Sequence, residues 1–173
     1  MIIVLIGYMA SGKTSIGKKL AKKLNYNFID LDDFIEEKEN LSVSEIFKSK
    51  GEVYFRKQES IYLNTLINSK DDTILSVGGG TPCYSGNMDV IIGSNNVKCV
   101  YLKATLQTLA NKLLLKKAKR PLIAHIETIE EMTEFIGKHL FERSHFYNQA
   151  QIKVSIDNKS KKEVVEAILL ELF

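Results

Sequence analysis

The feature that most constrains this chain is an eight-residue segment near its start, Gly7-Tyr8-Met9-Ala10-Ser11-Gly12-Lys13-Thr14. It matches the pattern G-x-x-x-x-G-K-[ST] at every defined position. Five apolar residues precede it and a helical pattern begins at the lysine, which is the strand–loop–helix context that the motif requires. Backbone N–H groups of such a loop converge on phosphate oxygens, and the helix N-terminus adds positive potential. The sequence therefore predicts a phosphate-binding loop.

Short β-branched runs alternate with amphipathic helical patterns along the chain, which is typical of a parallel sheet covered by helices. We expect strands at residues 2–6, 27–30, 73–77, 98–102 and 152–156, and helices at residues 13–24, 33–39, 43–50, 52–68, 106–115, 127–147 and 161–172. In such α/β folds, ligands bind beyond the carboxyl ends of the strands. A length of 173 residues suits one domain, 1–173. The glycine-rich run 77–82 fits no regular element, and we expect a turn with unusual backbone angles there.

The charge balance argues against nucleic-acid and membrane-surface proteins. A net charge of +3 is spread over 24 basic and 21 acidic residues, so we expect neither nucleic acid nor membrane as a partner. The two cysteines form no CxxC pair, which argues against a disulfide framework or a thiolate metal site. Reduced thiols and the absence of an export-like leader predict a cytoplasmic protein.

The chemistry of the loop assigns individual roles. Lys13 is expected to reach the β- and γ-phosphates of a nucleotide, and the Thr14 hydroxyl to ligate Mg²⁺. The residues expected to bind the nucleotide from this segment are Gly7, Ala10, Ser11, Gly12, Lys13, Thr14 and Ser15.

A second group of candidate residues lies in the segment 28–33. On an extended strand, Phe28, Asp30 and Asp32 point to one side, so two carboxylates would meet at the carboxyl end of the strand. Asp33 has a structural explanation, because with Glu36 three residues later it resembles a helix capping box. An ordinary turn also accounts for Asp30 and Asp32. Beside a phosphate loop, the better interpretations are a water-mediated Mg²⁺ ligand and a ligand of the acceptor hydroxyl.

Two predicted helices carry an arginine on an otherwise apolar face. Arg56 shares its face with Leu63 and Leu66, and Glu59 is placed to hold its guanidinium. Arg143 lies on the apolar face of helix 127–147. Either arginine alone is explained by a long side chain reaching solvent from a helix edge. Two cases together suggest a shared buried anion, and a guanidinium matches a carboxylate bidentately.

In their order and spacing, these segments resemble the shikimate kinases over essentially the whole chain. The segments that carry the resemblance are Gly7 to Thr14, Asp30-Leu31-Asp32, Gly51 to Arg56, Gly78-Gly79-Gly80, Arg120-Pro121-Leu122 and Arg143 to Tyr147. There are two departures: Ala10 stands where many relatives have glycine, and Leu113, Leu114 and Leu115 offer no counterpart to a basic residue often found early in the lid.

The resemblance implies a three-layer P-loop kinase fold with a five-stranded parallel sheet and a mobile lid at residues 113–125. It implies transfer of the γ-phosphoryl group of ATP to the 3-hydroxyl of shikimate, with Mg²⁺, in the chorismate pathway. By the same resemblance, Lys13, Asp32 and Arg120 are catalytic, and Arg120 rides on the lid and approaches the phosphates. Asp32 and the turn Gly78, Gly79 and Gly80 hold the ring hydroxyls, Arg56 and Arg143 hold the carboxylate, and Asp30 helps to place the metal.

Alternative functions remain open at this point. Gluconate kinase is the nearest rival, since its acceptor is also a polyhydroxylated carboxylate, and another small-molecule P-loop kinase is a further option. From a different class, the chain could be a nucleotide-binding regulator without turnover. Retention of a complete acceptor site argues against a regulator. We expect the protein to act as a monomer on the small molecules ATP and shikimate.

Overall fold

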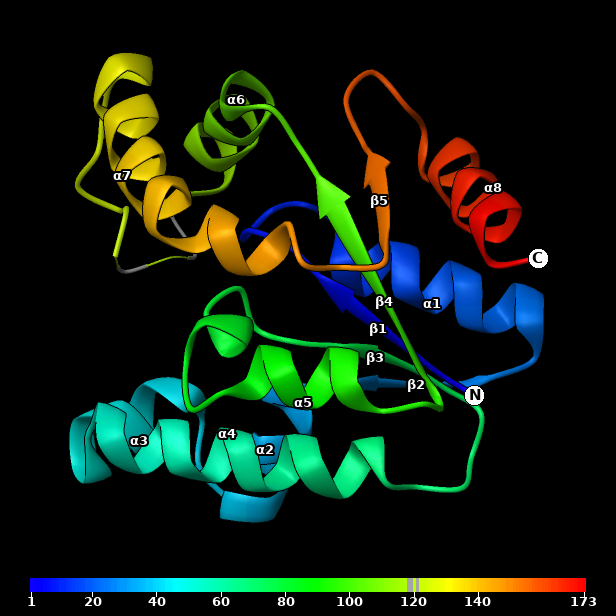
Figure 1. The fold of residues 1–173 in the computed structure, drawn as a ribbon. Helices are drawn as coiled ribbons and strands as arrows, with labels where there is room; N and C mark the ends of the chain where they lie inside the picture. The colour runs from blue at the N-terminus through cyan, green and yellow to red at the C-terminus, as the bar shows by residue number, and fades with distance from the viewer. Residues whose placement is uncertain (118–119, 121) are drawn as a thin grey trace.

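The computed structural model describes residues 1–117, 120 and 122–173. Its five strands form one sheet in the order β2-β3-β1-β4-β5, and every neighbouring pair is parallel (Figure 1). The strands are β1 (Ile2–Ile6), β2 (Asn27–Asp30), β3 (Thr73–Ser76), β4 (Val97–Lys103) and β5 (Ile152–Ser155). The predicted five-stranded parallel sheet is confirmed.

Helices cover both faces of this sheet and extend beyond its carboxyl edge (Figure 1). They are α1 (Lys13–Leu24), α2 (Leu31–Glu39), α3 (Val43–Lys50), α4 (Glu52–Ile67), α5 (Asn87–Gly93), α6 (Leu106–Lys116), α7 (Ile129–Tyr147) and α8 (Lys161–Leu172), with a short 3-10 helix, η1 (Thr81–Cys83). Helices α1 and α8 pack together on one face, α5 covers the other with α4 beside it, and α6 pairs with α7. Among the described residues, no helix is both long and apolar enough to cross a membrane.

The core is built around the central strands. All five residues of β1 and all four of β3 are buried, because helices cover both faces there and water reaches neither. The edge strand β5 instead alternates buried and exposed residues. In β4 five of the seven residues are buried, among them Cys99. The carboxyl ends of β1 and β3 therefore form a rigid platform for the segments that follow them.

Helix α2 begins two residues earlier than the sequence predicts. The side chain of Asp30 caps it and accepts a hydrogen bond from the backbone N–H of Asp32 (3.2 Å). The prediction that Asp33 is the cap with Glu36 as its partner is therefore wrong. Glu36 instead accepts from the backbone N–H of Val43 (2.7 Å), so it joins two helices. Asp30 is preferred because it has the extended backbone that a cap requires (φ −97°, ψ 125°).

Two short elements between β3 and β4 were not predicted. They are η1 and α5, whose few residues give too little periodicity for detection. The expectation of unusual backbone angles in the glycine turn is also wrong. None of Gly78, Gly79 and Gly80 has a positive φ, and Gly80 is close to helical (φ −87°, ψ −19°). Most other helix and strand ends agree with the sequence-based ranges within one residue, and α7 begins at Ile129 instead of 127.

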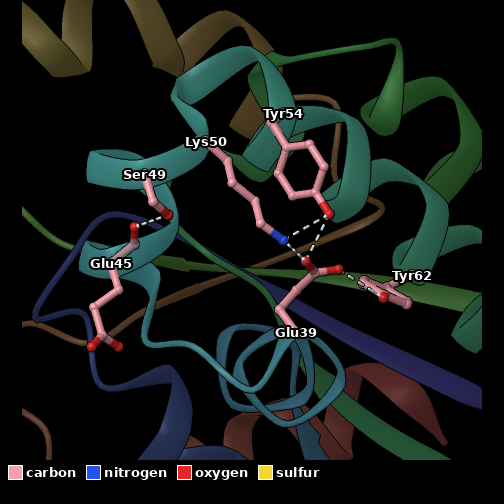
Figure 2. A network of polar contacts seen from close by, with 6 residues as sticks. All are labelled: Glu39, Glu45, Ser49, Lys50, Tyr54 and Tyr62. Carbon is pink, nitrogen blue, oxygen red and sulfur yellow. Dashed lines mark hydrogen bonds and ion pairs between the residues drawn. The ribbon is translucent and has the colours of Figure 1, made fainter.

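A polar network joins helices α2, α3 and α4 to one another. Glu39, at the end of α2, accepts hydrogen bonds from Tyr54 Oη (2.7 Å), Lys50 Nζ (3.0 Å) and Tyr62 Oη (3.1 Å), as Figure 2 shows. The partners come from α3 and α4, so one carboxylate joins three helices. We call these four residues the Glu39 network.

Candidate active site

The phosphate loop connects β1 to α1 and curves back over the end of the strand. Gly7 (φ 149°), Ala10 (φ 63°) and Gly12 (φ 88°) take positive φ values. Two of these are glycines, which adopt such angles freely, whereas the left-handed conformation of Ala10 costs about 1 kcal/mol. A Cβ at Gly7 would also lie 2.9 Å from the carbonyl oxygen of Leu102, so only glycine fits there.

Lys13 lies across the loop from the start of α1. Its Nζ donates to the carbonyl oxygens of Gly7 (2.8 Å) and Tyr8 (3.1 Å). Burial lowers the pKa of Lys13 from 10.5 to about 8, and Asp32 and Asp30 partly oppose this shift. An ammonium group whose hydrogen-bond partners are neutral carbonyls is placed to donate to anionic oxygens when they bind.

A cavity of about 340 Å³ opens beside the loop. It is lined by Met9, Ala10, Gly12, Lys13, Thr14, Ser15, Asp30, Asp32, Ser76, Val77, Gly78, Gly79, Lys116 and Arg120. We call it the phosphate cavity. Six of the eight residues predicted to bind nucleotide line it. The other two, Gly7 and Ser11, are buried residues of the loop itself; Ser11 is 1% exposed.

The two predicted carboxylates both line the phosphate cavity, but the reason given for their proximity is wrong. The strand ends at Asp30, and Asp32 belongs to the first turn of α2. They are close because Asp30 caps the helix that begins at Leu31. The second oxygen of Asp30, Oδ2, accepts from the Thr14 hydroxyl (2.9 Å). The capping bond thus fixes one carboxylate and aims the start of α2 at the loop.

Asp32 has an unusual electrostatic position. Burial raises the pKa of its carboxyl group from 3.8 to about 6, and the nearby charges of Asp30 and Glu59 raise it further. Lys13 and Arg56 oppose the shift. The hydrogen bonds among the described residues include none to its carboxylate oxygens. Asp32 is therefore ionised near pH 7 and retains free acceptor capacity toward the cavity.

A second cavity, of about 570 Å³, adjoins the first. It is lined by Asp32, Val43, Ser44, Phe47, Lys48, Phe55, Arg56, Glu59, Gly78, Gly79, Gly80 and Leu122. We call it the acceptor cavity. Three residues, Asp32, Gly78 and Gly79, line both cavities. The two spaces therefore meet at the Asp32 carboxylate and the glycine turn.

Arg56 is fixed at the wall of the acceptor cavity. Its Nη1 donates to Glu59 (2.9 Å), as the helical spacing predicted, and Glu59 is 1% exposed. The other oxygen of Glu59 accepts from the Thr81 hydroxyl (2.6 Å). A Cβ at Gly80 would lie only 2.9 Å from Nη2 of Arg56. A side chain at position 80 would therefore have to displace the guanidinium, and no positive φ calls for glycine there.

Arg143, the second predicted arginine, does not line either cavity. It approaches the glycine turn from α7: its Nη1 lies 3.5 Å from the position that a Cβ on Gly79 would take. Its guanidinium also lies over the ring of Tyr8, 5.6 Å from the centroid. The Tyr8 hydroxyl and His139 Nδ1 are hydrogen-bonded (2.8 Å), which ties the phosphate loop to α7. Arg143 is therefore at the edge of the place where the two cavities meet.

The predicted lid is described in part. Lys116 and Arg120 line the phosphate cavity, and Leu122, 71% exposed, lines the acceptor cavity. The backbone N–H of Arg120 donates to the carbonyl of Lys117 (2.9 Å). Lys119 and Pro121, which also fall in the predicted lid, lie outside the described residues.

Several residues of the site were not predicted from the sequence. Thr81, Phe47, Phe55 and Lys48 touch the acceptor cavity or its supporting carboxylate. Thr81 follows the glycine turn directly, and that position was the available signal. The aromatic residues carried no signal beyond the apolar face of an ordinary helix.

The oxygen ligands at the loop fit a magnesium ion bound with a nucleotide. No cluster of three or more His, Cys, Asp or Glu side chains suited to a metal occurs in the described part of the chain. Mg²⁺ in nucleotide sites needs only one or two protein oxygens, because phosphates and water supply the rest. The Thr14 hydroxyl and the Asp30 carboxylate, in contact at the mouth of the phosphate cavity, are such a pair.

Comparison with known proteins gives a consistent result. The family model for shikimate kinase matches residues 9–173. A shikimate kinase of Flavobacterium johnsoniae is 48% identical over 167 residues, 96% of each chain. The crystal structure of shikimate kinase from Bacteroides thetaiotaomicron superimposes with a TM-score of 0.88 at 34% identity, covering 99% of this chain and 98% of that one. The shikimate kinase from Acinetobacter baumannii, solved in complex with shikimate, gives 0.84 at 28% identity and covers 99% and 92%.

Proposed function

This chain belongs to the shikimate kinase family, and we propose which of its residues transfer the γ-phosphoryl group of ATP to the 3-hydroxyl of shikimate. The observation that carries the proposal is the junction of the two cavities at Asp32, Gly78 and Gly79. A hydroxyl group bound there faces the phosphate loop on one side while the rest of its molecule fills the acceptor cavity. That arrangement aligns the acceptor with the donor, which is the main requirement of phosphoryl transfer.

Asp32 has the properties of the residue that orients this hydroxyl. Its carboxylate has free acceptor capacity at the junction, and its pKa of about 6 keeps it ionised at neutral pH. The transition state of phosphoryl transfer is loose, so the alcohol loses its proton late and an ordinary carboxylate suffices to accept it. The glycine turn gives backbone groups close access to the other ring hydroxyls.

Lys13 and Arg120 are proposed to neutralise the charge that develops on the phosphate oxygens. Both line the phosphate cavity. Phosphate oxygens would replace the loop carbonyls as partners of Lys13 Nζ and raise its lowered pKa again, because an anion favours the ammonium form. Thr14 and Asp30 would hold Mg²⁺, which neutralises phosphate charge when it is bound.

The acceptor carboxylate is assigned to Arg56 and Arg143. Arg56 lines the acceptor cavity, and Glu59 accepts a hydrogen bond only from its Nη1. Arg143, which lies in α7, approaches the same glycine turn. Two guanidinium groups near one small cavity favour a carboxylate-bearing acceptor over a neutral sugar.

The segment 113–125 is proposed to act as a lid over both substrates. Its residues Lys116, Arg120 and Leu122 already line the two cavities, so closure would need only a local movement. Closure would exclude water that otherwise hydrolyses ATP. We further propose one domain acting as a monomer in the cytoplasm. Both cavities are lined by a single chain, and the free cysteines suit a reducing compartment.

The proposal is tested by measuring ADP release with shikimate, quinate, gluconate, AMP and CMP as acceptors. We expect shikimate to be used with the highest kcat/KM. Arg56→Lys keeps the charge and loses the fork, so it should lower kcat/KM for shikimate by roughly 5- to 150-fold while KM for ATP stays nearly constant. A preference for gluconate, or an equal effect of Arg56→Lys on both substrates, would contradict the assignment.

A further inference from the structure

Two aromatic rings lie near the Arg56 guanidinium: Phe55, 5.3 Å from Cζ, and Tyr84, which the assigned functions do not use. The ring of Tyr84 lies under this guanidinium, with the centroid 4.0 Å from Cζ. This is well inside the range of an effective cation–π contact. The backbone of Gly80 also lies directly against the guanidinium, since a Cβ there would be 2.9–3.3 Å from three of its atoms. Tyr84 and Gly80 come from the same segment, on either side of η1.

Tyr84 contacts Arg56 from outside the acceptor cavity. Arg56 lines the acceptor cavity and also an outer cavity of about 580 Å³ on the surface of α4. Tyr84 lines the outer cavity and is absent from the acceptor cavity. An acceptor molecule would therefore meet the guanidinium and not the ring. Any effect of Tyr84 on the reaction must pass through Arg56.

The remaining contacts leave the guanidinium incompletely held. Nη1 donates to Glu59, whereas Nε is buried and has no hydrogen-bond partner among the described residues. Glu52 Oε1 lies 3.6 Å from Nε, which makes an ion pair but is too far for a hydrogen bond. With only the Glu59 hydrogen bond short, the plane of the Arg56 guanidinium can tilt about that bond. The Tyr84 ring, stacked against the guanidinium, restricts this tilt.

The turn that carries Tyr84 is itself rigid. The backbone N–H of Asn87 donates to the Tyr84 carbonyl (2.9 Å), and the Asn87 side chain donates to the Thr81 carbonyl (2.9 Å). Asn87 and Thr81 are fully buried. The ring of Tyr84, by contrast, belongs to a residue that is 39% exposed and contributes little to the core. A fixed backbone that presents an exposed aromatic ring to a ligand-binding arginine has no evident use in stability.

We propose that Tyr84 is a positioning residue, which holds the Arg56 guanidinium in the orientation that receives the acceptor carboxylate. The inference rests on the proposed function and adds to it a determinant of acceptor affinity outside the cavity. It predicts a specific pattern: the aromatic face matters, the Tyr84 hydroxyl does not, and ATP binding is unaffected.

The first test compares four substitutions at this position in steady-state kinetics. Tyr84→Phe and Tyr84→Trp keep the ring and should retain wild-type KM for shikimate within about twofold. Tyr84→Leu and Tyr84→Ala remove it and should raise that KM by about three- to tenfold, the range of a partly exposed cation–π contact. In all four variants KM for ATP should stay constant. Phe141→Ala, which removes an exposed aromatic of α7, is the matched control and should change neither KM.

The second test uses fluorescence, because the chain contains no tryptophan. Tyr84→Trp creates a single reporter against Arg56. Its emission should change when shikimate is added and remain unchanged when ADP alone is added. The shikimate signal should be lost in the double variant Tyr84→Trp, Arg56→Lys, or shift to higher shikimate concentration.

The outcomes separate failure of this inference from failure of the proposed function. If wild-type protein does not phosphorylate shikimate, the proposed function falls and the inference falls with it. If wild type is active and Tyr84→Leu keeps its KM, or if KM for ATP rises equally, Tyr84 does not position Arg56. A leucine variant that matches the phenylalanine variant in KM would likewise overturn the role of the ring. Thermal unfolding of each variant shows whether a raised KM comes from a folding defect. If the alanine variant does not fold, the tryptophan titration still tests the proposal.

Discussion

The two ends of helix α2 carry carboxylates in opposite conditions. Glu39, at the last turn, accepts three hydrogen bonds from Tyr54, Lys50 and Tyr62, and these bonds hold its pKa below the ordinary value of 4.5 (Figure 2). Asp32, at the first turn, accepts none from the described residues, and burial raises its pKa to about 6. The same helix thus presents one carboxylate that the fold has paired and one that it leaves unpaired.

The lysines of the two regions differ in the same way. Lys50 is paired with Glu39, and hydrogen bonding to Glu39 and Tyr54 raises its pKa. Lys13 contacts neutral carbonyls, and burial lowers its pKa to about 8. In the Glu39 network the fold favours both charged forms, whereas in the active site it disfavours both. The charges of the site become favourable only when substrates provide their partners, which is how electrostatic preorganisation trades stability for activity.

The largest expected effect separates the two lysines. Lys13→Ala should lower kcat at least ~100-fold, because it removes the charge that stabilises the phosphate oxygens in the transition state. Lys50→Ala is the matched control and should leave kcat within about twofold. Steady-state ADP release measures both. Near-normal turnover of Lys13→Ala, or an equal loss of kcat in both variants, would contradict the claim that Lys13 acts in catalysis and Lys50 only in the fold.

The second prediction concerns Asp32. Asp32→Asn should lower kcat by roughly 100-fold, the usual contribution of a positioned acid–base group, with little change in the Mg²⁺ requirement. The same change should stabilise the protein without substrates at pH 8 by roughly 1–2 kcal/mol, since it removes a desolvated charge. Urea unfolding at pH 8 measures this gain. A variant that is both inactive and less stable would mean that Asp32 supports the fold.

Much of the fold followed from periodicity and one motif. All five strands were predicted. The signal was clearest for the central strands β1 and β3, because parallel strands that are buried on both faces must be mostly apolar. The start of α2 could not be obtained in this way. Asp30, Asp32 and Asp33 are all acceptable caps, and only the tertiary position of β2 decides that Asp30 takes the role.

Part of the site could also be predicted from the sequence, namely the part that depends on local spacing. The i, i+3 spacing of Arg56 and Glu59 is local, so their ion pair was predictable. The close approach of Gly80 to a guanidinium depends on Arg56, which is 24 positions away in the chain, so the sequence did not reveal it. Contacts made by long-range packing leave no local pattern.

The third prediction concerns the dependence of kcat/KM on pH. Asp32 must be ionised to accept the hydroxyl, so activity should fall about tenfold per pH unit below an apparent pKa near 6. Lys13 must be protonated to attract phosphate, so a second decline should begin near pH 8. The residual activity of Asp32→Asn should lack the acid decline, whereas Glu39→Gln should retain it. An acid decline that persists in Asp32→Asn would assign it to another group.

The smallest effect on activity, and a clear effect on stability, is expected for Glu39→Gln. The side chain of Glu39 is 8% exposed and accepts from three donors. In glutamine these bonds lose the charge of the carboxylate, and one tyrosine hydroxyl must turn to accept from the amide nitrogen. The free energy of unfolding at pH 7 should fall by about 1–3 kcal/mol, with kcat and both KM values unchanged. Because the folded pKa of Glu39 is below 4.5, its stabilising contribution is complete above that pH and is lost as the pH falls through the folded value. The difference between wild type and variant in urea unfolding should therefore shrink from pH 7 to pH 3.5. A difference that does not depend on pH would show that packing, and not the charge of Glu39, stabilises this end of α2.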